Sequence, residues 1–123
     1  MPSYTHTLTF QPDDTRLVVV FVARAAWAHH RMRGLLFHPA PPKGHALLIE
    51  RCNAVHTLGM RYPLDLVFLD RERRVARVCA NVRPGRFFVH GGARAASVLE
   101  AAAGWLPLAL LQPGTRAVIQ PSA

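Results

Sequence analysis

The sequence is short of lysine, cysteine and acidic residues. Of its 15 basic residues only Lys43 is a lysine, and the 123 residues include two cysteines. Two cysteines cannot form a disulfide-dense scaffold, so we expect Cys52 and Cys79 to be reduced thiols in a core. Only seven residues are acidic, which leaves a formal net charge of +8.

The chain also lacks a long hydrophobic run. The apolar run at residues 17–23 has seven residues, and the longest uncharged stretch, 101–115, contains two prolines. A helix that crosses a bilayer needs roughly 20 apolar residues, and an export signal needs a basic region followed by an apolar run. We therefore expect no membrane span, no targeting segment and, by default, a cytoplasmic protein.

A strong nucleic-acid signal is missing as well. The arginines are spread from Arg16 to Arg116, apart from four within residues 71–77 that lie beside Glu72. Proteins bind phosphate backbones with basic side chains on one face, and they bind single strands with interleaved aromatic side chains. The composition therefore indicates a solvated basic surface and does not favour nucleic acid as a partner.

The residues that are present predict a mainly β chain. Half of them are hydrophobic, and most recur with the spacing of strands. We expect one mostly antiparallel domain over residues 1–123. The expected strands are 16–23, 46–50, 64–70, 75–82 and a last strand after residues 112–115. Less regular segments are residues 1–14 (an edge strand or a loosely attached tail), 25–36 (a short amphipathic helix), 96–104 (a short strand or frayed helix) and 105–111 (a helical turn).

Residues 52–70 combine polar side chains with the most apolar expected strand. The strand at 64–70 is apolar on both faces, which indicates burial from both sides, and a charged hairpin turn follows at 71–74. Asp65 interrupts the apolar pattern. Because a buried ionised carboxylate is costly unless paired, we expect Arg33, Arg61 or backbone amides near Thr57 to be its partner.

The polar residues ahead of this strand predict a binding site at its entrance. We expect a module that binds a small polar or anionic ligand, or a peptide segment, with an arginine fork holding a carboxylate or phosphate. The residues expected to form this pocket are Arg33, His56, Thr57, Met60, Arg61 and Asp65. We expect Phe87 and Phe88, in a long connection, to lie nearby.

A small hydrolase is the alternative hypothesis. His56 and Asp65 would then act as acid and base, and Cys52 is a candidate nucleophile beside His56. The sequence contains no nucleophile elbow and no phosphate loop, which favours the binding module. The two cysteines, with His56 and His90, match no standard zinc-ligand spacing, so we expect neither a metal nor another cofactor.

Three segments resemble the domain of unknown function 192 family. They are residues 31–37 (RMRGLLF), 56–70 (HTLGMRYPLDLVFLD) and 97–104 (SVLEAAAG), with PGT following the last. Family members commonly have Trp, Met, Lys, Asn and Thr where this chain has residues 56–61. The resemblance covers roughly residues 17–120. It implies a small β sandwich or partly closed barrel with one or two short helices, and no established activity.

Overall fold

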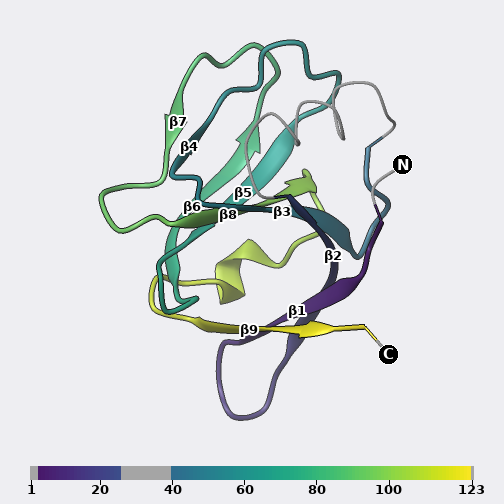
Figure 1. The fold of residues 1–123 in the computed structure, drawn as a ribbon, viewed down its shortest axis with the longest axis vertical. Coiled ribbons are helices and arrows are strands. Elements are labelled where there is room, and N and C mark those ends of the chain that lie inside the picture. The colour runs from purple at the N-terminus through teal and green to yellow at the C-terminus, as the bar shows by residue number, and fades with distance from the viewer. Residues whose placement is uncertain (1–2, 26–39, 123) are drawn as a thin grey trace.

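The computed structural model describes residues 3–25 and 40–122. The main sheet contains β1 (His6–Gln11), β2 (Val18–Ala25), β3 (His45–Glu50), β5 (Leu64–Leu69), β6 (Val75–Val82), β8 (Ser97–Ala102) and β9 (Arg116–Pro121). Two short strands, β4 (Ala54–Val55) and β7 (Val89–His90), pair separately, and η1 (Leu108–Leu110) is a turn of 3-10 helix (Figure 1). Within these residues no helix is long and apolar enough to cross a membrane. The mainly β fold expected from the sequence is confirmed.

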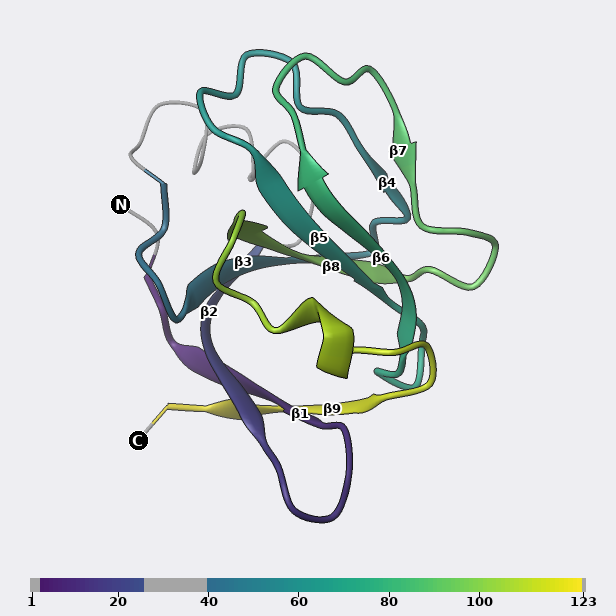
Figure 2. The same ribbon diagram turned by 180° about the vertical axis from the view of Figure 1, so that it is seen from behind.

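The seven strands of the main sheet have the order β6-β5-β8-β3-β2-β1-β9. Neighbours are antiparallel except β2 and β3, which are parallel. The sheet curls until its edge strands approach each other (Figures 1 and 2). There the amide of Val75 donates to the carbonyl of Thr115 at 2.8 Å, and a bridge joins Arg74 to Arg116. The sheet is therefore a half-barrel whose edges join at one end.

The concave side of the sheet is filled by an inner cluster of apolar side chains. Leu8, Phe10 and Leu99 are among its fully buried members. Leu106 and Leu111, on either side of η1, belong to the same cluster. Figure 2 shows η1 inside the curl of the sheet. The short helix therefore closes the interior of the half-barrel.

An outer cluster covers the other face of β5. Alternate residues of β5 pack there against Val55 of β4 and Val89 of β7. Val67 and Leu69 point to the inner cluster on the opposite face. Because both faces are covered, all six residues of β5 are buried. The prediction that this strand is covered on both faces is confirmed. The sequence did not reveal the cover, because β4 and β7 have only two residues each.

The other expected strands agree with the structure within two residues, and the hairpin turn lies where it was expected. Residues 97–102 are strand rather than helix. The expectation of an edge strand at the N-terminus is wrong, because β9 from the end of the chain pairs with β1 and leaves β1 between β2 and β9. The expected helix at 25–36 lies outside the described residues, except for Ala25, the last residue of β2.

Gly91 lets the connection between β7 and β8 lie directly on the outer cluster. A Cβ atom here would stand 2.3 Å from the ring of Phe68 and 2.7 Å from Cβ of Ala95. The amide of Gly91 also donates to the carbonyl of Asn53 at 2.8 Å, which fixes the connection beside the chain that follows β3. This close approach requires a residue without a side chain.

Gly91→Ala should therefore destabilise the domain by about 1 to 3 kcal/mol, because a methyl group there overpacks the buried ring of Phe68. Urea unfolding measures this change in free energy through the shift in midpoint. Phe68→Leu should relieve part of the clash, so a double-mutant cycle should show favourable coupling between the two substitutions. Additive effects would contradict the proposed contact.

Candidate functional site

Asp65 is buried, and backbone amides hold its carboxylate. Oδ1 accepts a hydrogen bond from the amide of Asn81 at 2.8 Å, and Oδ2 accepts one from the amide of Gly104 at 3.1 Å. Asn81 has a φ of 50° and lies where β6 shifts register against β5. Asp65 does have partners, as expected. They belong to β6 and to the residues just after β8, the strands on either side of β5, and are not Arg61 or the amides near Thr57.

Thr57 joins two connections at the entrance to β5. It is fully buried, and its Oγ1 donates to the carbonyl of Arg83 at 2.7 Å and accepts from the amide of Arg86 at 2.8 Å. Its own amide donates to the carbonyl of Arg86, also at 2.8 Å. The hydroxyl group of Thr57 therefore fastens the connection before β5 to the connection after β6.

Met60 and Asp65 lie on opposite faces of β5. Met60 packs in the outer cluster, whereas strand alternation puts Asp65 on the face of Val67, in the inner cluster. His56 is half-buried and Arg61 is exposed, while Arg33 lies outside the described residues. Strand β5 therefore separates Met60 from Asp65, and a pocket formed by the expected residues remains a prediction.

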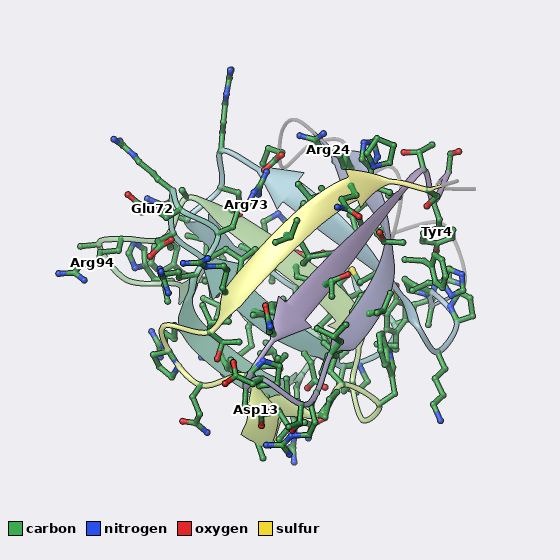
Figure 3. The ribbon with its side chains drawn as sticks, turned by 90° about the horizontal axis from the view of Figure 1, so that it is seen from below. Tyr4, Asp13, Arg24, Glu72, Arg73 and Arg94 are labelled. Atoms are coloured by element: carbon green, nitrogen blue, oxygen red, sulfur yellow. The ribbon has the colours of Figure 1, made fainter. Side chains whose placement is uncertain are left out.

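A basic concavity lies at the other end of β5. Two adjoining hollows of about 900 and 730 Å³ share Arg51, Asp70, Arg71 and Ala96. The charged residues that line them are Arg24, Glu50, Arg51, Asp70, Arg71, Glu72, Arg73 and Arg94. Figure 3 shows four of these, Arg94, Glu72, Arg73 and Arg24, along one margin of the molecule. We call this region the basic concavity.

Glu50 holds two arginines of the basic concavity. Arg73 donates to both carboxylate oxygens at 2.8 Å, and Arg24 forms a second ion pair. The hydrogen bonds from Arg73, with the help of Arg24 and against the effect of burial, keep the pKa of Glu50 below its usual value. Arg73 also donates to Oγ of Ser97 at 3.2 Å. Arg24 and Arg73 are therefore engaged in holding the fold together.

Two arginines of the basic concavity have a left-handed backbone. φ is 52° at Arg51 and 61° at Arg73. Residues with a Cβ atom rarely adopt this conformation, and such strain is concentrated at functional sites. At Arg73 the pairing with Glu50 offsets the strain. Arg51 has no ion pair within residues 3–25 and 40–122, so its conformation has no comparable compensation there.

Three arginines remain available to a ligand. Arg51, Arg71 and Arg94 are exposed, line the larger hollow and form no ion pair within the described part of the chain. Asp70 is occupied by its own turn, because its Oδ1 accepts hydrogen bonds from two backbone amides. Five arginines and three carboxylates leave the basic concavity positive. Planar guanidinium groups are suited to binding carboxylate or phosphate.

The sequence alone does not predict this site. It contains the arginines at 71–77, but their composition indicates a solvated surface. The contacts that build the concavity join Glu50 to residues 23 and 26 positions away, so no local spacing predicts them. One signal was available: Arg73 lies in the hairpin turn, where a left-handed backbone normally favours Gly or Asn.

Together the fold and the site define a half-barrel domain with a basic concavity at one end of β5. The domain of unknown function 192 (DUF192) family, described as "Uncharacterized ACR", matches residues 9–119. The chain belongs to this family, as the resemblance of its motifs predicted.

Two solved structures share the fold. One is a protein of unknown function from Novosphingobium aromaticivorans DSM 12444, with a TM-score of 0.78 and 21% identity over 91% of this chain and 83% of that one. The other is a Sinorhizobium meliloti 1021 protein named "putative transcription regulator", with a TM-score of 0.77 and 21% identity over 98% and 97%. At this identity the likeness shows the fold alone. No curated protein matches the chain.

Asp65→Ala should destabilise the domain by about 1 to 4 kcal/mol, because the amides of Asn81 and Gly104 would lose their acceptors. Chemical denaturation measures the loss. Asp65→Asn keeps one acceptor oxygen and should lie between the wild type and the alanine variant. An unchanged midpoint for Asp65→Ala would show that the carboxylate does not hold these strands.

Glu50→Gln should destabilise the domain by about 1 kcal/mol at neutral pH, since ion pairs at the surface are partly screened. Folding lowers the pKa of Glu50, so its contribution is present above the ordinary value of 4.5 and is lost as the pH falls through the lower folded value. The difference in unfolding free energy between wild type and variant should therefore shrink in acid. Urea unfolding over an acidic pH series tests the sign, and a difference that grows in acid would contradict it.

Proposed function

We propose that this domain binds a small anionic ligand in the basic concavity. The observation that carries the proposal is the set of exposed arginines, Arg51, Arg71 and Arg94, around one hollow of about 900 Å³. Each guanidinium group can donate two parallel hydrogen bonds to a carboxylate or a phosphate. A ligand with one or two such groups fits both the charge and the size of the hollow.

The three arginines come from three separate elements. Arg51 follows β3, Arg71 belongs to the turn between β5 and β6, and Arg94 belongs to the connection between β7 and β8. They are therefore brought together only in the folded chain. The turn that carries Arg71 is held in place by Asp70, which accepts two amide hydrogen bonds within it, at 3.0 and 2.9 Å. Such preorganisation lowers the entropy cost of ordering side chains around a ligand.

The carboxylates of the basic concavity support a small ligand over a polyanion. Glu50, Asp70 and Glu72 lie among the arginines and would face any long chain of phosphates. The name of the Sinorhizobium protein suggests a role at DNA, where a protein binds phosphates through many uncompensated cations. In this chain Arg24 and Arg73 are already paired with Glu50. This arrangement supports a compact anion.

The pocket predicted beside His56 and Thr57, and the hydrolase hypothesis, remain predictions. A general acid or base must be within hydrogen-bond reach of the proton that it transfers. Both oxygens of Asp65 accept hydrogen bonds from backbone amides, which supports a structural role for this carboxylate. We therefore favour the basic concavity as the ligand site.

Titration calorimetry with inorganic phosphate, pyrophosphate and citrate tests the proposal. We expect at least one of these anions to bind the wild type. Arg51→Gln, Arg71→Gln and Arg94→Gln should each weaken that binding by about tenfold or more, because each removes a charge-assisted hydrogen bond. Phosphate and citrate as separate probes distinguish the two anionic groups.

Arg116→Gln is the matched control, because it removes the same charge from β9, outside the lining of the concavity. It should keep the affinity within about twofold, since solvent and salt screen an exposed charge that does not line the hollow. His56→Ala and Arg61→Gln test the pocket predicted from the sequence. Binding lost in these two variants alone would move the site there. Binding of no anion, or an equal loss in Arg116→Gln, would contradict the basic concavity as the site.

A further inference from the structure

A second surface, at the opposite end of β5 from the basic concavity, carries exposed aromatic rings. Phe87 and Phe88, in the connection between β6 and β7, are 81% and 64% exposed. Leu58, in the connection before β5, is 38% exposed. Both connections lie together at the top of Figures 1 and 2. Grouped exposed apolar side chains mark interaction surfaces more often than isolated ones do.

The exposed charges around these rings are all positive. Arg61, Arg83 and Arg86 are exposed in the same two connections. Residues 56–63 and 83–96 contain no Asp or Glu. We call Leu58, Arg61, Arg83, Arg86, Phe87 and Phe88 the aromatic tip. Its composition suits a partner that is both anionic and able to accept apolar rings.

Backbone hydrogen bonds hold the aromatic tip in place. The amide of Thr57 donates to the carbonyl of Arg86 at 2.8 Å, and the amide of Gly85 donates to the carbonyl of Thr57 at 2.9 Å. The hydroxyl group of Thr57 adds two further bonds, to Arg83 and Arg86. The two connections are therefore fastened to each other, and the exposure of Phe87 and Phe88 is a built feature of the fold.

We propose that the aromatic tip docks on an anionic lipid bilayer. Phenylalanine rings enter the boundary between headgroups and acyl chains, while arginines bind the lipid phosphates. The strength of such interfacial binding grows with the apolar area that enters the bilayer and with the attraction to anionic lipids, and the tip supplies both contributions. A bilayer fits better than an acidic protein, because the rings project outward and a deformable lipid surface needs no matching pocket.

Vesicle flotation with the whole chain tests this docking. The wild type should float with equimolar phosphatidylglycerol and phosphatidylcholine vesicles and stay in solution with phosphatidylcholine alone. Raising the salt concentration should weaken the binding, because the arginine contribution is screened. Arg83→Gln and Arg86→Gln should each reduce partitioning by about fivefold, and Phe87→Ser with Phe88→Ser should reduce it by about tenfold or more.

Two matched controls separate the tip from general basic or apolar character. Arg116→Gln removes the same charge beside Arg74, just before β6 begins, and should change partitioning by less than about twofold. Val19→Ser with Val118→Ser removes two other exposed apolar residues and should have no effect. Circular dichroism verifies that every variant is folded. Equal losses in tip and control variants would overturn the proposal.

Phe87→Trp reports insertion directly. The fluorescence emission of this variant should shift to the blue on anionic vesicles and be quenched by brominated lipid. The wild type, which contains two tryptophans of its own, is the control, and the changes in the variant should exceed those in the wild type. Flotation without such a change would overturn insertion of the rings. A wild type that binds to none of the vesicles would overturn the lipid proposal. If that wild type binds polyglutamate, the partner is instead an acidic protein.

Discussion

The carboxylate of Asp65 is the interaction that fastens β5, the buried strand between the two surfaces, to its neighbours. It accepts an amide hydrogen bond from Asn81 in β6 and another from Gly104, just beyond β8, so it links β5 to both of its neighbours. At Asn81 the left-handed backbone directs β6 into the connection that carries the aromatic rings. After Gly104 the chain leads to η1 inside the curl of the sheet. One buried side chain therefore fixes the start of two segments that are not neighbours in sequence.

The turn at residues 70–74 connects barrel closure to the basic concavity. Arg73 in this turn has a left-handed, strained backbone, and the hydrogen bonds of its side chain to Glu50 offset the strain. The carbonyl of the same residue accepts the amide of Ala117 at 2.8 Å, and the next residue, Arg74, bridges to Arg116. The guanidinium group therefore faces the concavity while the backbone joins the two edges of the sheet. A substitution that moved this turn would alter both the closure and the site.

The sequence predicted the elements well and the site poorly, for the same physical reason. Strand β5 can be recognised in the sequence because nearly all of its consecutive residues are apolar, which indicates burial on both faces. The charged turn after it indicates a hairpin. Asp65 was recognised as a buried carboxylate that needs a partner, but its amide partners lie 16 and 39 residues away. The pairing of Glu50 with Arg24 and Arg73, which are 26 and 23 residues away, is hidden for the same reason, whereas β4 and β7 are hidden because each has only two residues. Alternation along a strand predicts burial, whereas the identity of a partner depends on topology.

The two ends of β5 are chemically different, and the strand between them explains why they stay apart. Arg71 follows its last residue, and the connection with Leu58 precedes its first. All six residues of β5 are buried, so packing on both faces holds the strand in place between the two surfaces. The arginines at one end alternate with carboxylates, which suits a compact anion, while those at the other end accompany exposed rings and no acid. If the aromatic tip rests on a bilayer, the strand directs the basic concavity away from the lipid. The ligand site then stays open to solvent while the domain is docked.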